Sequence, residues 1–369
     1  MNFFSDVLKE AYLYEKLDDG KARCNVCPRR CVIAPGKRGF CRTRKNVDGK
    51  IYSLVYGMLS SEAVDPIEKK PLYNFWPGSW AYSVATIGCS FRCAHCQNWQ
   101  ISQADPSEDG ASGTLDRRRP WGGQLRLRQV TPQELVSRVE RSGAQCLAYT
   151  YNEPLIWLEY ILDCSKLAHD RGIQNVLVSN GYSTPEAIDL LAPHLDAANV
   201  DVKAFSDQFY RDVCKVPSIK PVLDAVVQMK ELGVFVELTT LLIPGLNDDP
   251  EELRALVAWV RDEVGVDTPV HFSAFHPDYE MRDRPRTSVA TLEAAYSLAK
   301  EAGLQYVYLG NVRSSFGEHT TCPACGKAVI ERAGYSLLSV ALTEDNKCSF
   351  CGAQVNVRGP VTAERRSRF

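Results

Sequence analysis

The stretch Gly88–Ser102, GCSFRCAHCQNWQIS, places Cys89, Cys93 and Cys96 within eight residues, and no fourth cysteine follows nearby. A structural zinc site has four protein ligands, usually in two pairs, and spacings of three and two residues do not match that pattern. Three thiolates on one loop can hold three irons of a [4Fe-4S] cluster and leave the fourth iron open to another ligand. The sequence therefore predicts a cluster with one reactive corner, with a chance triplet or a partial zinc site as the alternative.

The residues around this loop predict an α/β fold. Helix starts are marked by Thr131, Thr184 and Asp249, each followed by proline, and glycines such as Gly143 and Gly303 follow the helical stretches. Between the helices lie short apolar segments that we expect to be strands: Ala81–Ile87, Cys146–Thr150, Asn175–Ser179, Ala198–Val202, Val234–Leu242, Val270–Phe275 and Tyr306–Leu309. This alternation favours a partial (β/α)6-type barrel, in which functional residues lie on the loops after the strands. The segment Gln103–Arg128, rich in glycine and mixed charge, predicts a mobile insertion or lid.

Composition narrows the class of protein. The chain has 369 residues, 45% hydrophobic and 24% charged, with a formal net charge of -2, so nucleic acid is an unlikely partner. No apolar run approaches the roughly 20 residues that span a bilayer, and the first residues do not resemble a targeting signal. We therefore expect a cytoplasmic protein without a membrane segment. Its fourteen cysteines then have little use as disulfides and indicate metal binding.

Two further cysteine groups flank the predicted barrel. The C-terminal quartet, in two C-x2-C pairs, predicts a structural zinc ribbon and comprises Cys322, Cys325, Cys348 and Cys351. The N-terminal quartet has spacings that suit either zinc or a second iron-sulfur cluster and comprises Cys24, Cys27, Cys31 and Cys41. We expect an N-terminal cysteine-rich region over residues 1–78, the barrel over 79–315 and the zinc-ribbon module over 316–369.

The C-x3-C-x2-C loop after a first strand, with His95 before the last cysteine, resembles the radical S-adenosylmethionine (SAM) superfamily. In that superfamily the open iron binds the amino and carboxylate groups of SAM. One electron from the cluster cleaves SAM to methionine and a 5'-deoxyadenosyl radical, which abstracts hydrogen from the substrate. The resemblance implies a radical SAM enzyme with a [4Fe-4S] cluster, SAM and an electron donor of the flavodoxin or ferredoxin type.

Further motifs resemble a narrower group, the AmmeMemoRadiSam-system radical SAM enzymes (AmrS), over nearly the whole length. They are TYNEPLI (150–156), VSNGY (178–182), VDVKAF (200–205), LTTLLIPGLNDD (238–249), HFSAFHPDY (271–279) and YVYLGNV (306–312). This resemblance implies Memo-like and AMMECR-like protein partners. The central motifs also resemble the glycyl-radical-enzyme activases.

By this similarity, Asn152 and Glu153 meet the methionine amino group, Lys203 reaches its carboxylate and His276 lies near the ribose. Asn180 and Asp201 complete the cofactor-binding candidates. Other roles are open for each residue: Glu153 can favour a helix start, Lys203 and Asp201 can form an ion pair, His276 can be an ordinary loop residue, and Asn180-Gly181 is a turn signal. Val178 stands where the activases carry an acidic residue, so one cofactor contact of the activases lacks its partner here.

Three functions compete on the sequence. The first is a radical SAM enzyme that abstracts hydrogen from an unidentified substrate, and the second is an activase that makes a glycyl radical on a partner enzyme. The third is a non-catalytic zinc-binding scaffold that uses both terminal modules. The terminal cysteine modules fit the activase hypothesis less well than the first.

Overall fold

The computed structural model describes residues 8–107, 112–114, 123–314 and 316–362. Its centre is an eight-stranded sheet in the order β19-β18-β17-β16-β15-β14-β9-β8. Six parallel pairings join β9 to β19, and β8 pairs antiparallel with β9 at the edge. The strands are β8 (Ser61–Pro66), β9 (Trp80–Ala85), β14 (Cys146–Tyr149), β15 (Gln174–Ser179), β16 (Ala197–Asp201), β17 (Phe235–Leu242), β18 (Val270–Ala274) and β19 (Val307–Gly310). All seven predicted strands are confirmed, and their neighbours follow chain order, as in a (β/α) barrel and unlike a doubly wound sheet.

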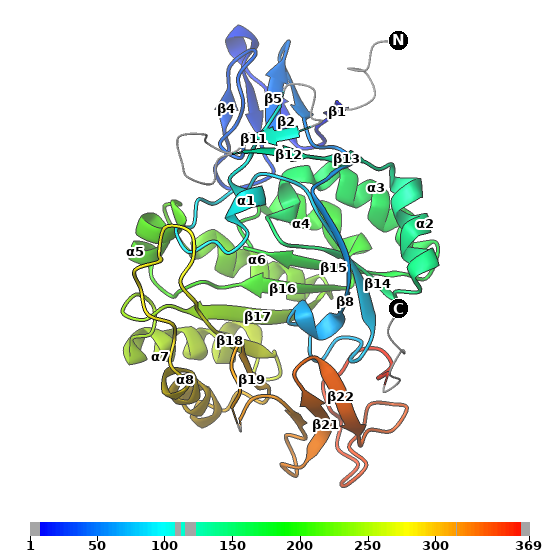
Figure 1. Cartoon of the computed structure of the whole chain (residues 1–369), viewed down its shortest axis with the longest axis vertical. Helices are drawn as coiled ribbons and strands as arrows, with labels where there is room; N and C mark the ends of the chain where they lie inside the picture. Colours follow the sequence, from blue (N-terminus) through cyan, green and yellow to red (C-terminus); the bar gives the residue numbers. More distant parts are fainter. Residues whose placement is uncertain (1–7, 108–111, 115–122, 315, 363–369) are drawn as a thin grey trace.

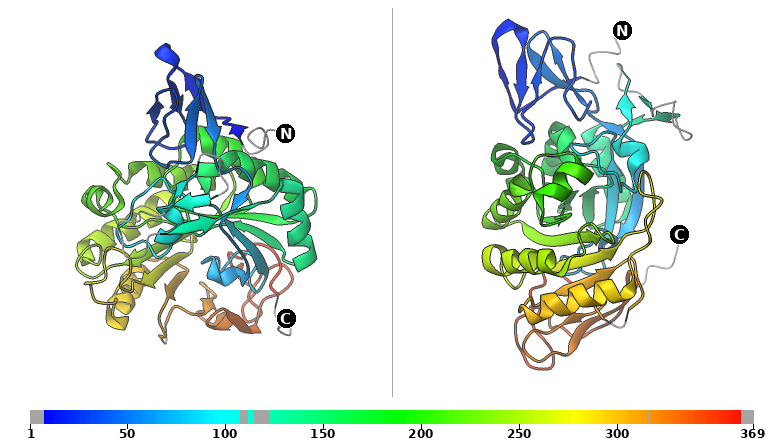
Figure 2. Two further views of the ribbon diagram at one scale, coloured as in Figure 1. Left: turned by 45° about the horizontal axis from the view of Figure 1, so that its top comes forward. Right: turned by 90° about the vertical axis from the view of Figure 1, so that its left-hand side faces the viewer.

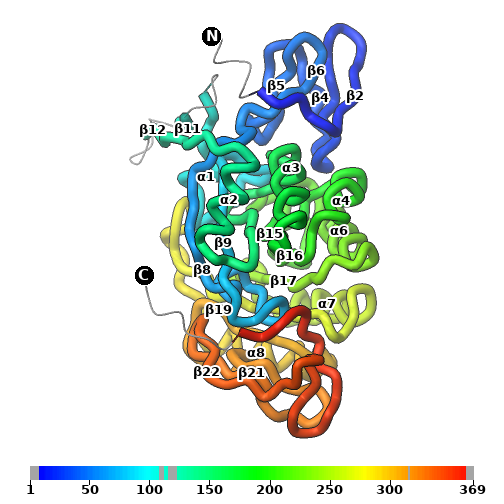
Figure 3. Tube along the Cα trace, turned by 90° about the vertical axis from the view of Figure 1, so that its right-hand side faces the viewer, coloured from blue at the N-terminus to red at the C-terminus, as the bar shows by residue number. Residues whose placement is uncertain are grey.

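The strand sequences are mostly apolar because helices cover the sheet. Every residue of β14 and of β18 is buried, as expected for parallel strands that are covered by the rest of the chain. Figure 3 shows α3, α4, α6, α7 and α8 following one another along one side of the molecule. The helices are α1 (Trp99–Ser102), α2 (Pro132–Ser142), α3 (Leu158–His169), α4 (Pro185–Leu191), α5 (Asp207–Phe209), α6 (Lys220–Glu231), α7 (Pro250–Trp259) and α8 (Val289–Glu301).

The predicted helix signals act as expected. Thr131 and Thr184 accept hydrogen bonds from the third residue of their helices, and Asp249 accepts from Glu251 and Glu252, each cap being worth about 1 kcal/mol. Gly143 ends α2 at a φ of 67°, a left-handed conformation that favours glycine. These caps fix where α2, α4 and α7 begin, and so fix the lengths of the loops after β15 and β17.

The N-terminal module, residues 8–53, consists of two small antiparallel sheets at one end of the molecule (Figure 1). One sheet contains β1 (Lys9–Glu10), β5 (Arg44–Val47) and β6 (Lys50–Ser53), and the other contains β2 (Tyr14–Lys16), β3 (Ala22–Cys24) and β4 (Val32–Ile33). Arg44 joins the module to α3 through two hydrogen bonds of 3.0 and 2.9 Å to Glu159, and both side chains are buried. Removing one partner of such a pair leaves a buried charge, which costs about 3–5 kcal/mol.

The C-terminal module lies at the opposite end of the molecule (Figure 2). Its sheet contains β20 (Thr320–Thr321), β21 (Ala328–Ala333) and β22 (Ser336–Val340). Arg332 is buried, donates to the Tyr73 carbonyl at 2.7 Å and lies 3.8 Å from Glu68. The C-terminal module therefore packs against the segment between β8 and β9.

The predicted insertion contributes small strands beside the cysteine loop. β10 (Asp105–Pro106), β11 (Ser112–Thr114) and β12 (Gln124–Arg126) form one sheet, and β13 (Arg128–Gln129) pairs with β7 (Met58–Leu59). Residues 108–111 and 115–122 lie outside the described residues, so the predicted mobility there stays a prediction. Among the described residues, no helix combines the length and apolarity that a bilayer crossing needs.

Candidate active site

A cavity of about 560 Å³ opens at the carboxyl ends of the parallel strands. Its walls come from the ends of β14 to β19, from the cysteine loop after β9 and from the segment that follows β8. The C-terminal module adds part of the rim, through Glu318 and Tyr335. A parallel sheet places its chemistry at this edge, so the cavity lies where the fold predicts it.

The cysteine loop forms one wall of this cavity. Cys89, Cys93 and Cys96 all line it, as predicted, and Cys89 and Cys93 are less than a tenth exposed. The amide of Phe91 donates to the Cys89 sulfur at 3.4 Å. Burial raises the pKa of the Cys96 thiol to about 11, and metal coordination would reverse this because the bound form is the thiolate. The wall thus offers three soft ligands that a metal would bind as thiolates.

Cys214 is a neighbour of this loop that local sequence patterns did not indicate. It is fully buried, lies beside the Cys93 thiol, and its carbonyl accepts a hydrogen bond from the Arg92 amide at 3.0 Å. It does not line the cavity, whereas Cys93 does. We interpret Cys214 as packing behind the loop, because a ligand for the fourth corner must face the cavity.

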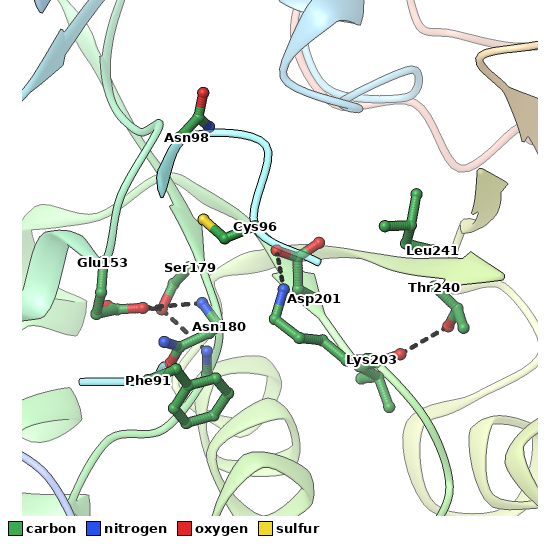
Figure 4. A network of polar contacts seen from close by, with 12 residues as sticks. Phe91, Cys96, Asn98, Glu153, Ser179, Asn180, Asp201, Lys203, Thr240 and Leu241 are labelled. Carbon is green, nitrogen blue, oxygen red and sulfur yellow. Dashed lines mark hydrogen bonds and ion pairs between the residues drawn. The ribbon is translucent and has the colours of Figure 1, made fainter. Parts of the chain in front are cut away.

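Glu153 is held by the protein itself (Figure 4). Its carboxylate accepts hydrogen bonds from the amides of Leu155 and Asn180 at 3.0 and 2.9 Å, and from the Ser179 hydroxyl at 2.9 Å. The predicted helix-start role is therefore present, since Glu153 caps the turn after β14. Burial raises the pKa of Glu153 to about 7, although these donors favour the charged form.

Asn152 provides a test of whether the site fits SAM. Its side-chain amide donates to the Gly88 carbonyl at 2.8 Å, which ties it to the start of the cysteine loop. Its Oδ1 atom is buried and has no hydrogen-bond partner, and the residue lines the cavity. A buried acceptor without a donor costs about 1–3 kcal/mol, and a ligand amino group would satisfy it. The site therefore fits the methionine end of SAM.

Lys203 and Asp201 lie together at the end of β16, and both line the cavity (Figure 4). The Lys203 ammonium is 2.9 Å from the Asp201 carboxylate, so the ion pair that the sequence left open is formed. Burial disfavours the Lys203 charge, but Asp201 together with the neighbouring Cys93 and Cys214 outweighs burial, so the pKa of Lys203 lies well above its ordinary value. Lys203 is thus a fixed cation that lines the same cavity as the three cysteines. Asn180 also lines the cavity and donates to the Ser90 hydroxyl at 3.0 Å.

His276 differs from the other candidates in position. It is exposed, does not line the cavity and lies 2.9 Å from the Gln97 amide nitrogen, while Gln97 itself is a lining residue. His95 lies inside, and burial together with the Lys203 charge lowers the pKa of His95 to about 3, so its ring is neutral. The role of His276 near a ribose stays a prediction.

Two lining residues escaped the sequence analysis, Lys70 and Tyr151. Lys70 is buried and lies 2.7 Å from Asp65, and the Tyr151 hydroxyl donates to the same carboxylate at 2.7 Å. Tyr151 has a φ of 70°, which is rare for a bulky residue and is common at functional sites. Its place beside Asn152 in the TYNEPLI motif was the available signal.

The C-terminal quartet converges on one point. Its four sulfur atoms lie within 4.8 Å of one another, and Cys322–Cys351 and Cys325–Cys348 are each 3.7 Å apart. Thiolates placed tetrahedrally around one zinc ion, with bonds of about 2.3 Å, lie about 3.8 Å apart. This geometry fits a single metal ion with four protein ligands. The N-terminal quartet instead lines a second cavity, between the N-terminal module and the cysteine loop.

Comparisons with known proteins agree with this geometry. The Radical SAM superfamily model matches residues 83–257. The uncharacterized protein MJ0808 of Methanocaldococcus jannaschii is 43% identical over 351 residues, covering 95% of this chain and 99% of that protein. The pyruvate formate-lyase-activating enzyme of Clostridium pasteurianum is 24% identical over 217 residues, covering 53% of this chain and 80% of that enzyme.

Among solved structures, a radical SAM methyltransferase from Sphaerobacter thermophilus is 15% identical with a TM-score of 0.48, covering 82% of this chain and 76% of that chain. The superfamily match includes the cysteine loop and the strands from β14 to β17. The chain therefore belongs to the radical SAM superfamily and is a radical SAM enzyme with relatives among the glycyl-radical activases.

Proposed function

We propose that this enzyme cleaves SAM reductively at a [4Fe-4S] cluster bound by Cys89, Cys93 and Cys96, and uses the resulting radical to abstract hydrogen from a substrate. The observation that carries the proposal is the convergence of these three thiols with the unpaired Oδ1 atom of Asn152 on one cavity. When bound, the cluster supplies the electron that breaks the sulfonium bond.

The chain's own residues orient the cofactor in this proposal. Asn152 accepts from the methionine amino group through its free Oδ1, and Lys203 faces the carboxylate as a cation held by Asp201. Glu153 keeps Asn180 and the turn after β14 in position. The parallel strands β9, β14, β15, β16, β17 and β18 are proposed to form the partial (β/α)6-type barrel, and β19 extends it by one strand.

We assign the enzyme to the AmmeMemoRadiSam system, with Memo-like and AMMECR-like partners and an electron donor of the flavodoxin or ferredoxin type. Six sequence motifs between residues 150 and 312 support this assignment, as do the cysteine groups at both ends. The C-terminal quartet is proposed to bind zinc, because its sulfur spacing suits a single tetrahedral ion. The role of this ion is structural, since four thiolates leave no open position.

The test is anaerobic incubation of the reconstituted protein with SAM and dithionite, followed by mass spectrometry for 5'-deoxyadenosine. Its formation is expected, and its absence from a protein with a full iron content would refute the proposal. Candidate partner proteins are then added and analysed for mass changes. A glycyl-radical EPR signal on a partner would instead identify the enzyme as an activase.

A further inference from the structure

The N-terminal quartet encloses its own space beside the cysteine loop. Cys24, Cys27, Cys31 and Cys41 all line the second cavity, and the remaining walls are mostly apolar. The other lining residues are Val26, Arg29, Ile33, Gly39, Arg44, Ser90, Glu153, Leu155, Ile156 and Tyr182. Four soft ligands around an interior space are a built metal site, because buried thiols gain little else from converging.

Sulfur spacing separates a single ion from a cluster. Among the described residues, only the C-terminal quartet brings three or more sulfur, imidazole or carboxylate ligand atoms within 4.8 Å of one another. No three sulfurs of the N-terminal quartet meet this distance, although all four line one cavity. Ligands of one zinc ion lie closer than this, at about 3.8 Å. The N-terminal sulfurs are therefore spaced more widely than the ligands of one zinc ion, as are the three thiols of the cysteine loop.

Hydrogen-bond donors face this space. The Thr43 hydroxyl donates to the Cys41 sulfur at 3.2 Å. Arg44 lines the cavity and is 1% exposed, and its Nε–H has no hydrogen-bond partner. A buried N–H group without a hydrogen-bond partner beside four thiols is suited to donate to the sulfides of an iron-sulfur cluster.

We infer that the N-terminal quartet binds a second [4Fe-4S] cluster, with one thiolate on each iron. This inference decides between the zinc and iron-sulfur alternatives that the sequence left open. With all four irons ligated, the second cluster has no site for SAM or substrate and is suited to electron transfer. The cluster itself does not depend on the proposed function, whereas the transfer role does.

The second cavity adjoins the cysteine loop directly. Ser90, which follows Cys89, lines it, and Glu153 lines both cavities. The Arg29 Nε–H donates to the Ser90 carbonyl at 2.9 Å. A Cβ atom at Gly88 would lie 2.8 Å from the Cys41 carbonyl, so the two cysteine segments touch there. In the transfer step a flavodoxin-type donor loses one electron, the second cluster gains it and passes it on, and the first cluster is reduced by one electron.

The test uses the variant Cys89→Ala/Cys93→Ala/Cys96→Ala, which lacks the first site. After anaerobic reconstitution we expect about four irons and four sulfides per chain, with an EPR signal after reduction by dithionite. A folded variant that holds no iron and gains a second zinc ion would overturn the inference. Should this variant not fold, Cys27→Ala/Cys31→Ala gives the complementary result, with wild-type iron falling from about eight to about four per chain. Iron that stays at the wild-type level in that variant would overturn the inference.

The two claims fail separately. Wild type with about four irons and the triple variant with none would leave the proposed function standing and remove the second cluster. About four irons per chain in both wild type and the triple variant would leave the second cluster standing and remove the cluster of the proposed function. For the transfer role, the Cys27→Ala/Cys31→Ala variant should cleave SAM at the wild-type rate when dithionite is the reductant. When reduced flavodoxin is the reductant, its rate of SAM cleavage should be at least about tenfold lower than that of wild type. Equal rates with flavodoxin in variant and wild type would overturn that role.

Discussion

The side chain of Asn152 donates to the Gly88 carbonyl at 2.8 Å and leaves its own Oδ1 atom buried without a partner. One residue thus joins the end of β14 to the start of the cysteine loop and presents a free acceptor to the cavity. This links the position of the predicted cluster to that of the predicted cofactor, since both depend on the same loop.

Asn152→Ala is expected to weaken SAM binding about tenfold, because a hydrogen bond to a charged amino group is worth about 1.5–3 kcal/mol. Equilibrium dialysis under anaerobic conditions measures the affinity, and iron content reports on the cluster. The exposed change Gln133→Ala in α2 serves as the control. Unaltered SAM affinity at full iron content would remove Asn152 from the cofactor site.

Lys203→Met is expected to weaken SAM binding about tenfold, because the cofactor carboxylate loses its buried cation. Asp201→Asn should have a smaller effect, since Asp201 acts by holding Lys203 at 2.9 Å. The double variant should bind no worse than Lys203→Met alone, because the two residues act as a unit. Losses of affinity that add in the double variant would contradict the claim that Asp201 acts through Lys203. A loss of stability without a loss of affinity would mean that the pair is structural only.

Cys325→Ala is expected to remove about one zinc ion per chain and to lower the melting temperature by about 5 °C or more, because an opened structural site loses its binding energy. Zinc analysis and calorimetry under argon measure both effects. Lys347→Ala, an exposed change in the same module, should alter neither. Unchanged zinc content and melting in Cys325→Ala would refute the structural role.

Glu68 gives a prediction for pH. Burial raises the pKa of Glu68 to about 7 from its ordinary value of 4.5, while Arg332 and the Gly78 amide oppose the rise. The folded state therefore binds the proton more tightly, and this contribution to stability is full below pH 4.5 and lost as pH rises through 7. The unfolding free energy of wild type should therefore fall as the pH rises from 4.5 through 7. In Glu68→Gln we expect this fall to be smaller by about 3 kcal/mol.

Urea denaturation at several pH values measures how the unfolding free energy changes with pH. Glu140→Gln, an exposed partner of Arg171, is the matched control and should follow wild type. Parallel slopes for Glu68→Gln and wild type would show that Glu68 does not carry the effect.

The sequence predicted the parallel sheet well because its strands are buried and their helices carry strong caps. It missed β8, whose segment SEAVDP is half exposed, charged and followed by no long helix. The short strands of the N-terminal module were also missed, because strands of two to four residues have no detectable period. The parallel α/β architecture was therefore predictable, while the terminal sheets were not.

For the site, local motifs identified the three cysteines, Asn152 and Lys203, and the structure brings them to one cavity. Partners distant in sequence could not be read from spacing. Tertiary packing alone brings Cys214 beside Cys93 and places Arg332 against the Tyr73 carbonyl. His276, taken from a motif, lies exposed outside the cavity.

The central claim is that three thiols hold the catalytic cluster and no protein atom fills its fourth corner. The most direct test is SAM cleavage to 5'-deoxyadenosine by Cys93→Ala and Cys214→Ala, each reconstituted anaerobically. The account predicts that Cys93→Ala loses cleavage while Cys214→Ala keeps its cluster and its activity. Cleavage retained in Cys93→Ala, or a cluster that is lost in a folded Cys214→Ala protein, would contradict it.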